Sequence, residues 1–442
     1  MKSKIAILGF GIEGESIANY LLKKNYKDIT ICDSDANLAN KPKQFKYILG
    51  PDYLKNLNRF DIIFRSPGIP FQTKEVLLAG KKATSVTRYF FEHCPCKIIA
   101  VTGTKGKGTT STLAYEMLKK AGRDAYLGGN IGNSPLDFLD KLKKESIVVL
   151  ELGHGQIEDL ETGPDIGIIL GVTQDHLDYH PDIKTYRSAK HPLISKQKKS
   201  QIAIINEDYE GNEPFLTLGE GRKFKISTRG ETPLGAYAHK QKLIIKTDKK
   251  QLELIDASQI KLLGPHNIEN ALPSSLAAFL SGVSKENIVH VLKTFRGLPH
   301  RLEFVCEKNG IKFINDSFST TPETSIAAIN SFATSLILVA GGSEKHADFT
   351  SWAEAVKNAK HLKQIILIGL TGPRMAKAIG RDGRIMLVKT LENAFLKIRK
   401  FATKGDTVVM SPACASFDQF KNYKERGESG TNASTLAFCK YE

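Results

Sequence analysis

The chain has 442 residues, 41% hydrophobic and 25% charged, which is the composition of an ordinary soluble protein with room for about three domains of ~150 residues. Its net charge of +16, from 63 Lys and Arg against 47 Asp and Glu, favours polyanionic ligands such as nucleotides. The lysines are spread out without interleaved aromatic residues, no apolar run approaches the ~18 residues of a membrane helix, and there is no signal-peptide pattern. We therefore expect a cytoplasmic protein with neither nucleic acid nor membrane as a partner.

Residues 1–93 carry the pattern of a small Rossmann-like domain. A predicted strand that begins at Lys4 is followed by a glycine turn and an amphipathic helix. The glycines of the turn match Gly-x-Gly-x-x-Gly at Gly9, Gly11 and Gly14. Asp33 follows the next predicted strand, 29–32, at the distance of a ribose-binding acid, which is typical of a NAD-dependent dehydrogenase. About ninety residues make only half of a dinucleotide fold, so a mononucleotide or a diphosphate-sugar fits equally well.

Six cysteines are scattered through the chain, and a protein of this size needs no disulfides for its core. Cys94-Pro95-Cys96, preceded by His93, has the spacing of half a metal site. Since the sequence has no second cluster at ligand spacing, we expect structural cysteines at this point.

Residues 97–122 predict a strand, a glycine-rich loop and a helix. Residues 98–101 are apolar without alternation, as in a buried strand, and helical spacing of apolar residues begins after Thr109. Three glycines between them let backbone N–H groups converge on an anion: Gly103, Gly106 and Gly108. Lys107 adds a full positive charge beside the helix N-terminus. We expect a nucleoside triphosphate here, the alternative being a glycine turn with an exposed lysine.

The spacing of this loop is Gly-x-x-Gly-Lys, which is shorter than the standard Gly-x-x-x-x-Gly-Lys-Ser/Thr phosphate loop. Gly108 stands where the standard loop has the hydroxyl that binds the metal ion. Thr109 or Thr110 would then supply that hydroxyl.

Polar residues follow two predicted strands, 147–150 and 166–172, and would meet the phosphate loop at the carboxyl edge of a parallel sheet. Glu151 follows the first strand and is a candidate magnesium ligand, with a plain surface charge as the alternative. His176 follows the second and is either a metal ligand or an ordinary solvated histidine.

Residues 215–260 predict a β-rich insertion because apolar and polar residues alternate. A helix from about 264 to 282 follows, with Asn267 as a natural cap and Pro273 as a kink or a later start. Further strands that end in polar residues then predict another α/β domain with a second ligand face. These strands are 313–314, 336–340, 365–368 and 407–410.

Taken in order, these motifs resemble those of the Mur ligases of peptidoglycan synthesis. The matching segments span the chain: Gly-x-Gly-x-x-Gly, Ser66-Pro-Gly-Ile, Thr102-Gly-Thr-Lys-Gly-Lys, Gly129-Asn-Ile-Gly, Glu151-Leu, Asp175-His-Leu-Asp, Ala189-Lys190, His266-Asn-Ile-Glu-Asn, Leu298-Pro-His-Arg-Leu-Glu, Asn315-Asp-Ser and Gly341-Gly. The stretch 411–423 resembles the members that add glutamate. The resemblance implies an α/β fold of three domains: a Rossmann-like, UDP-substrate-binding domain at 1–93, a central P-loop-type ATPase domain at 94–297, and a Rossmann-like, glutamate-binding domain at 298–442.

The resemblance also implies an activity. ATP would phosphorylate the carboxylate of UDP-N-acetylmuramoyl-L-alanine, and the amine of D-glutamate would attack the acyl phosphate, with Mg²⁺ as the cofactor. This is a ligation in the synthesis of peptidoglycan precursors, and hence in cell wall biogenesis, cell shape and cell division. The partners would be these small molecules and the protein a monomer. The Ser-Thr-Thr-Pro sequence at 319–322 also resembles ligases that add L-glutamate, so this alternative stays open.

Site residues follow from the resemblance, position by position. The catalytic residues are Lys107, Glu151, His176 and Lys190. The ATP-binding residues are Gly103, Thr104, Lys105, Gly106, Lys107, Gly108, Thr109, Asn267, Asn270, Arg301 and Asp316. The UDP-substrate-binding residues are Gly11, Ile12, Glu13, Gly14, Ser34, Asp35, Gly68 and Asn130. The glutamate-binding residues are Thr320, Lys345, Ser416 and Tyr423. The metal ligands are Thr109, Glu151, His176 and, if it is carbamylated, Lys190, which would otherwise be an exposed helix lysine.

The chain departs from the family pattern at several positions. Besides Gly108, Gly-His-Gly at 153–155 replaces Ser-Ser-Phe/Tyr, and Gly430 stands where an aromatic residue commonly follows Gly-Glu-Ser. Phe318 and Thr321 replace a lysine and an asparagine. These departures affect the metal and glutamate contacts and motivate one further alternative, a catalytically weakened, nucleotide-binding scaffold.

Overall fold

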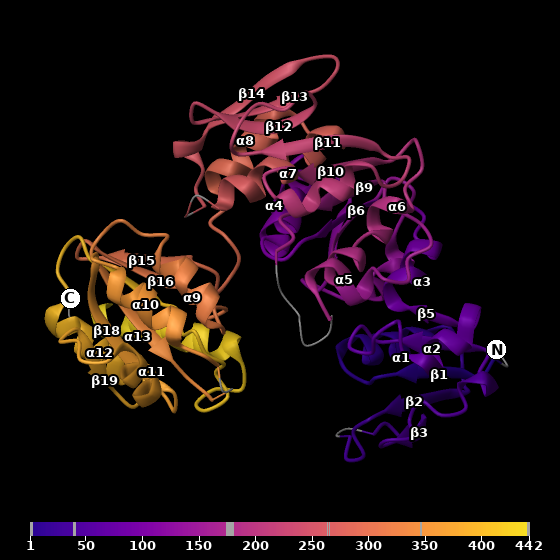
Figure 1. Cartoon of the computed structure of the whole chain (residues 1–442), viewed down its shortest axis with the longest axis horizontal. Coiled ribbons are helices and arrows are strands. Elements are labelled where there is room, and N and C mark those ends of the chain that lie inside the picture. Colours follow the sequence, from indigo (N-terminus) through magenta and orange to yellow (C-terminus); the bar gives the residue numbers. More distant parts are fainter. Residues whose placement is uncertain are drawn as a thin grey trace. The chain divides into compact units, whose positions relative to one another are not determined.

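The structure, a computed structural model, describes residues 3–38, 41–173, 181–262, 264, 266–344 and 347–439. It contains two compact units (Figure 1). Unit 1 comprises Met1–Ile260 and His266–Thr294, and unit 2 comprises Lys261–Pro265 and Phe295–Glu442. Unit 1 holds two sheets and unit 2 holds one, each combined with helices, which confirms the predicted α/β fold class. The domain borders after residues 93 and 297 stay a prediction.

The first sheet of unit 1 is parallel, with the strand order β3-β2-β1-β4-β5. Its strands are β1 (Ile5–Leu8), β2 (Ile29–Asp33), β3 (Lys46–Leu49), β4 (Ile62–Arg65) and β5 (Ala83–Ser85), and its helices are α1 (Ile12–Lys23), α2 (Lys74–Ala79) and α3 (Val86–His93). Every residue of β1 is buried, as expected for a parallel strand covered on both faces. The glycine turn after β1 therefore lies at the carboxyl edge of this sheet.

The central sheet has nine strands in the order β14-β13-β12-β11-β10-β9-β6-β8-β7. They are β6 (Lys97–Thr102), β7 (Ala125–Gly129), β8 (Ile147–Glu151), β9 (Ile166–Ile169), β10 (Ile202–Asn206), β11 (Arg222–Ser227), β12 (Gly235–His239), β13 (Lys242–Lys246) and β14 (Gln251–Asp256). The pairs from β7 to β12 are parallel, and β12 to β14 form an antiparallel meander. The predicted β-rich insertion is thus confirmed, and it extends the central sheet.

The helices of the central part are α4 (Lys107–Lys120), α5 (Ile183–Ser188), α6 (Pro192–Ser195), α7 (His266–Leu280) and α8 (Lys285–Thr294). The prediction that Asn267 caps α7 is wrong. Asn267 is the second residue of the helix, and its side-chain oxygen accepts a hydrogen bond from Asn270 Nδ2 at 2.8 Å. Pro273 lies inside α7 and does not delay its start.

One hydrophobic cluster runs through both sheets of unit 1. It includes Phe64 and Phe90 from the first sheet and its helices, and Phe138 and Leu150 from the central part. Contacts between these two parts of unit 1 therefore rest on a shared core.

Unit 2 has a six-stranded sheet in the order β15-β16-β20-β17-β18-β19. Its elements are β15 (Glu303–Lys308), β16 (Ile311–Asn315), α9 (Pro322–Ile329), β17 (Leu336–Gly341), α10 (Thr350–Asn358), β18 (Leu362–Ile368), α11 (Gly372–Ile379), β19 (Ile385–Leu387), α12 (Leu391–Phe401), β20 (Thr407–Met410) and α13 (Tyr423–Cys439). Only β15 pairs antiparallel among the described strands of this sheet. The predicted polar residues after β16, β17, β18 and β20 therefore share one edge.

Two hydrophobic clusters cover the two faces of this sheet. One contains Trp352 of α10 with residues of α9 and α11, and the other contains Phe395 of α12 with Met410 of β20. The only tryptophan of the chain is thus buried in unit 2.

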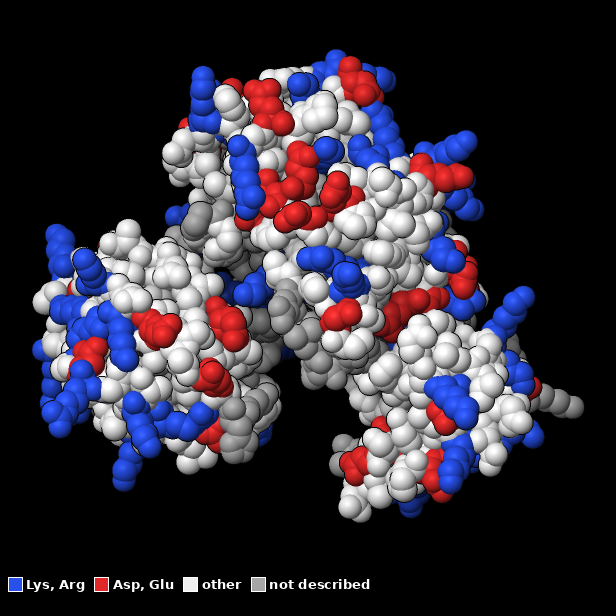
Figure 2. Space-filling view, viewed as in Figure 1, with Lys and Arg blue, Asp and Glu red and all other residues white. Residues whose placement is uncertain are grey.

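One stretch of unit 2 is strongly basic. Residues 357–404 hold twelve Lys and Arg against Asp382 and Glu392, a surplus of ten out of the net charge of +16. These residues span α11, β19 and α12, and Figure 2 shows Lys and Arg gathered over this part of the molecule. This stretch of unit 2 thus carries a local surplus of positive charge.

Candidate functional site

The glycine-rich loop after β6 packs closely against its neighbours. Gly103 has φ +155° and Gly106 has φ +83°, conformations that L side chains rarely adopt. A Cβ atom on Gly103 would lie 2.6 Å from Leu170 Cβ, and one on Gly106 would lie 2.2 Å from Asn270 Oδ1. Only glycine fits at these two positions, so the backbone of the loop approaches its neighbours with no side chain between them.

Lys107 is the first residue of α4 and folds back over this loop. Its Nζ donates hydrogen bonds to the carbonyl oxygens of Gly103, at 3.1 Å, and Thr104, at 3.0 Å. The N-terminus of α4 follows Gly106, which provides no side-chain cap. A full positive charge and the positive end of a 14-residue helix thus meet at one loop, which is the electrostatic setting that anions prefer.

Thr104 connects the loop to Lys190 through Tyr186. Thr104 Oγ1 exchanges hydrogen bonds with the backbone of Thr173 and lies 3.4 Å from the Tyr186 hydroxyl. Lys190 Nζ lies 4.2 Å from the centroid of the Tyr186 ring, and Lys190 is only 1% exposed. The alternative that Lys190 is an exposed helix lysine is therefore wrong. No sequence motif pointed to Tyr186, because it contacts Thr104, a residue far from it along the chain.

Glu151 ends β8 beside the phosphate loop. Its strand pairs with β6, with Val101 opposite Glu151, and Leu152 N donates to Val101 O at 2.9 Å. Glu151 is buried, so it is not a plain surface charge. The carboxylate lies one strand from the loop where phosphates would bind.

The oxygen donors around the loop fit Mg²⁺. This ion prefers carboxylate and phosphate oxygens and keeps several waters. Glu151 offers a carboxylate, half-buried Thr109 a hydroxyl, and Lys190 a carboxylate-like group when carbamylated. Within the described residues no three His, Cys, Asp or Glu side chains form a metal cluster, so phosphate oxygens and water would complete the shell. His176 lies outside the described residues.

Asn267 and Asn270 lie beside the phosphate loop. Thr110 Oγ1 donates to Asn270 Oδ1 at 3.2 Å, and Asn270 Nδ2 donates to Asn267. Both asparagines are buried. These bonds hold α4 against α7, and the role of the two residues as adenine contacts stays a prediction.

The predicted UDP-substrate residues lie at the carboxyl edges of the sheets of unit 1. Gly11, Ile12, Ser34, Asp35, Gly68 and Asn130 are exposed, and Gly14 is buried. The loops after β1 and β2 are tied together by Asp33, whose Oδ2 accepts from Phe10 N at 2.7 Å and whose Oδ1 accepts from Asp35 N at 2.9 Å. Asp33 is the acid that would bind the ribose of a dinucleotide, and both of its carboxylate oxygens already accept hydrogen bonds from backbone N–H groups. This weakens the dehydrogenase alternative.

In unit 2, Asp316 lies in the polar segment after β16. Burial raises the pKa of its carboxyl to about 6, although Ser411 Oγ and Leu302 N donate to it at 2.7 and 3.1 Å. The family resemblance implies that Asp316 contacts ribose, and that role stays a prediction.

Arg426 of α13 holds this segment in place, and no sequence signal pointed to it. Its guanidinium donates to Ser317 Oγ and Ser317 O, at 3.0 and 2.9 Å, and to the carbonyl oxygens of Cys414 and Ala415, both at 3.0 Å. Arg426 is 1% exposed, and burial lowers its pKa to about 10, so it stays charged at neutral pH. One buried cation thus joins two polar loops of unit 2.

Comparison with known families matches three segments that together span most of the chain. Residues 3–88 match the MurD-like N-terminal domain of Mur ligases, residues 101–278 the Mur ligase middle domain, and residues 300–414 the glutamate ligase domain of Mur ligases. The chain belongs to the Mur ligase family. This confirms the predicted resemblance.

Individual relatives of this Mur ligase agree with the match. The UDP-N-acetylmuramoylalanine–D-glutamate ligases of Acetivibrio thermocellus and Ruminiclostridium cellulolyticum are 37% and 33% identical to it, over 96% of this chain and 94% of theirs. In fold, it is similar to MurF of Thermotoga maritima in complex with ADP, with a TM-score of 0.62, 18% identity, and coverage of 99% of this chain and 95% of that one. It is likewise similar to MurC of Thermotoga maritima, with a TM-score of 0.60, 16% identity, and coverage of 97% and 98%.

The structure explains why this Mur ligase has glycine at 155. A Cβ atom there would lie 2.7 Å from the carbonyl oxygen of Pro67, so an aromatic side chain does not fit. Next to it, Gln156 accepts from Gly153 N at 2.8 Å and donates to Glu13, whose pKa is raised by burial. Gln156 thereby connects the predicted UDP-substrate turn to the segment after Glu151, a contact that spans 143 residues and leaves no local pattern.

Phe318 takes part in a stack of three side chains in unit 2. The Arg301 guanidinium carbon lies 3.6 Å from the centroid of the Phe318 ring, and the Tyr423 ring meets Phe318 edge-on at 5.0 Å. Thr320 N donates to Phe318 O, and Ser416 is buried. Lys345 lies outside the described residues, and the glutamate contacts stay predictions.

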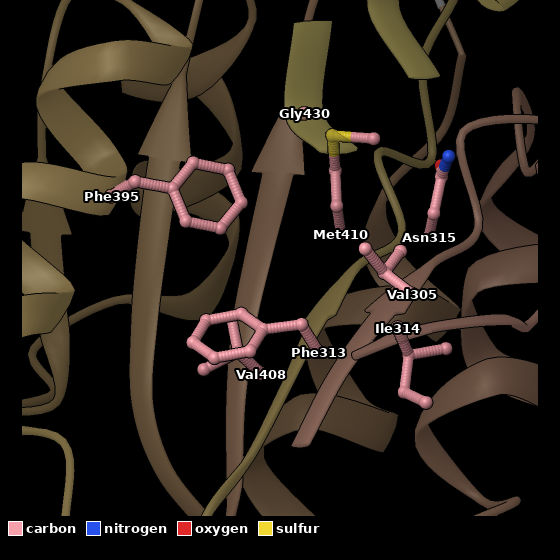
Figure 3. Close-up of a pocket in the computed structure, with 8 residues that line it drawn as sticks. All are labelled: Val305, Phe313, Ile314, Asn315, Phe395, Val408, Met410 and Gly430. Carbon is pink, nitrogen blue, oxygen red and sulfur yellow. The ribbon is translucent and has the colours of Figure 1, made fainter. Parts of the chain in front are cut away.

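Gly430 borders a small cavity in unit 2 (Figure 3). The cavity has a volume of about 10 Å³, room for about one water molecule, and its lining is mostly apolar. Its lining residues are Val305, Phe313, Ile314, Asn315, Phe395, Val408, Met410 and Gly430. The cavity beside Gly430 is thus too small for a substrate.

Proposed function

We propose that this Mur ligase uses ATP to add D-glutamate to UDP-N-acetylmuramoyl-L-alanine, through an acyl phosphate. The observation that carries the proposal is the 37% identity, over 96% of the chain, to a relative of that name. The phosphate loop with Lys107 supports it, because a dehydrogenase has no use for such a loop.

The residues of unit 1 would bind and orient the triphosphate. Backbone N–H groups after Gly103 and at the start of α4 would hold the phosphate oxygens, and Lys107 would exchange its carbonyl contacts for a phosphate. Its charge would stabilise negative charge developing on the transferred phosphoryl group. Mg²⁺ would neutralise further phosphate charge when bound by Thr109, Glu151, His176 and carbamylated Lys190.

The acceptor amino acid would bind in unit 2. We assign its two carboxylates to Thr320, Lys345, Ser416 and Tyr423, a set of one cation and three hydroxyl groups that suits a dianion. The Arg301 and Asp316 side chains would contact phosphate and ribose of the nucleotide. We place glutamate of the D configuration here because the relatives that match the chain carry it in their names.

The remaining properties belong to the same proposal. No helix within the described residues has both the length and the apolar content to cross a bilayer. We propose a monomeric cytoplasmic enzyme with small-molecule substrates and three domains at 1–93, 94–297 and 298–442.

Phosphate release tests the proposal directly. The purified chain is incubated with ATP, Mg²⁺, UDP-N-acetylmuramoyl-L-alanine and either enantiomer of glutamate. We expect release with D-glutamate and none with L-glutamate. Release with L-glutamate alone would support the other stereochemistry, a change in nicotinamide absorbance would support the dehydrogenase, and ATP binding without release would support the scaffold.

A further inference from the structure

Two cysteines lie in the short connection between the first sheet of unit 1 and the strand that leads to the phosphate loop. Helix α3 ends at His93 and β6 begins at Lys97, with Cys94-Pro95-Cys96 between them. Cys94 N donates to Phe90 O at 2.8 Å and so closes α3. Pro95 is exposed and both cysteines are half-buried, so small reagents can reach them.

The two sulfur atoms are close neighbours. Cys94 Sγ and Cys96 Sγ are 3.5 Å apart, across the single intervening residue Pro95. The hydrogen bond between them lowers the pKa of Cys94 and raises that of Cys96. Cys94 is therefore the better nucleophile at neutral pH, since the thiolate is the reactive form.

Two other described cysteines, Cys32 and Cys414, are in a different environment. Burial raises the pKa of Cys32 to about 12 and that of Cys414 to about 11, which keeps both as inert thiols. Cys306 is half-buried on β15. The pair at 94 and 96 thus has the nucleophile and the neighbouring resolving thiol that redox-active sites combine.

We propose that Cys94 and Cys96 form a redox-active dithiol that low-molecular-weight disulfides oxidise reversibly to a Cys94–Cys96 disulfide. The Cys94 thiolate attacks one sulfur of the small disulfide, which breaks its S–S bond and releases one small thiolate. Cys96 then gives its proton to solvent and attacks the Cys94 sulfur, which releases the second small thiolate. The protein dithiol loses two electrons, and the small disulfide gains them.

The geometry makes this disulfide labile. The sulfur atoms must close from 3.5 Å to about 2.05 Å, and the backbone of residues 94–96, which already bends at Cys96, must shift to allow it. A strained disulfide is easily reduced again, which is typical of regulatory rather than structural bonds. A reducing compartment would hold the pair as thiols until oxidant rises.

Oxidation would affect β6, the strand that leads to the phosphate loop. Cys96 is the residue before β6, and the start of β6 is fixed by Ile98 N, which donates to Asp165 Oδ2 at 2.8 Å. A shift of residues 94–96 would pull on the start of β6, whose other end opens into the loop of Lys107. The oxidised protein would then turn over ATP several-fold more slowly, a consequence that rests on the proposed function.

Mass spectrometry tests the site without an activity assay. The reduced full chain is incubated with excess oxidised glutathione. Its remaining free thiols are then blocked, and the protein is digested with trypsin. We expect the peptide of residues 89–97 to lose two hydrogen atoms, and the denatured protein to titrate two thiols fewer than its six. Dithiothreitol should restore both readouts. An unmodified peptide, or disulfides formed elsewhere, would overturn the proposal.

Single variants separate the two roles. Cys96→Ser should stop at a stable mixed disulfide between Cys94 and glutathione, and Cys94→Ser should react far more slowly. Cys306→Ser is the matched control and should form the Cys94–Cys96 disulfide like the parent. Phosphate release is measured in parallel: reversible slowing in the parent but not in Cys96→Ser supports the link to the loop, and equal rates before and after oxidation contradict it. A chain without ligase activity still gives the mass readout, so the two proposals fail separately.

Discussion

Two polar loops in this protein are held in different ways. In unit 1, the loop that begins at Gly103 takes its shape from glycine backbone. Lys107, the first residue of α4, donates a hydrogen bond back to the carbonyl oxygen of Gly103. In unit 2, the segment 315–317 has no glycine and is held by buried side chains, above all by Arg426. The first loop is specified by neighbours in sequence, and the second by a residue 109 positions away.

Because the two loops are held differently, we expect substitutions in them to affect different properties, namely enzyme turnover in one unit and protein stability in the other. A side chain that only touches the surface of a backbone loop can be removed without unfolding it, whereas a buried cation with four hydrogen bonds cannot. We therefore expect variants in unit 1 to change turnover and variants in unit 2 to change unfolding. The chain offers a convenient probe, because its one tryptophan, Trp352, is buried in unit 2 and its fluorescence reports the unfolding of that unit.

Lys107→Ala should have the largest effect. Loss of a positioned charge at the transferred phosphoryl group should slow phosphate release by about 10³-fold, while the free energy of unfolding changes by less than about 1 kcal/mol. Lys120→Ala, an exposed lysine at the far end of the same helix, is the control and should keep its activity. Retention of most activity in Lys107→Ala would mean that this loop is not the ATP site.

Arg426→Ala should destabilise unit 2 by about 4 kcal/mol, because three backbone carbonyls and a hydroxyl lose their buried donor. Urea unfolding followed by Trp352 fluorescence measures this loss. Lys424→Ala on the exposed side of α13 serves as the control and should change little. A loss below about 1 kcal/mol would contradict the idea that side chains hold this loop.

Asp316 should make the free energy of unfolding of unit 2 depend on pH. Its folded pKa of about 6 lies above the ordinary value of 3.8, so between these values the folded state binds more protons than the unfolded state. Stability should therefore be highest below about pH 4 for this group and fall by up to about 3 kcal/mol as pH rises through 6. Asp316→Asn removes the titration, so the difference in stability between the parent and the variant should change across this range. Parallel curves would contradict the raised pKa.

The same contrast explains what the sequence could predict. The phosphate loop, the strand ends and the parallel sheets follow from local patterns of glycine, apolar runs and polar tips, and they were predicted. Arg426, Gln156 and Tyr186 act through contacts that are distant along the chain, so no local pattern identifies them. The cap assigned to Asn267 was wrong for a local reason: α7 begins one residue earlier, at His266, and the Asn267 side chain binds Asn270 of the same helix.

Gly430→Ala should have the smallest effect, and it is the one expected to stabilise. Alanine favours a helix by up to about 1 kcal/mol over glycine, and Gly430 lies inside α13 beside the small cavity. The new Cβ would lie 2.7 Å from Met410 Cε, the far end of a flexible side chain that can move (Figure 3).

Gly427→Ala, one turn earlier in the same helix, is the matched control for this variant. Its Cβ would lie 2.2 Å from His300 Nδ1, in a ring held by a hydrogen bond with Asn315 and edge contact with Tyr423. The same helix preference is gained at both positions, so the opposite sign expected at 427 isolates the cost of moving a fixed side chain. If both variants lowered the unfolding midpoint of Trp352 fluorescence, Met410 would be as fixed as His300, and the core of unit 2 would be as tightly specified as its polar loop.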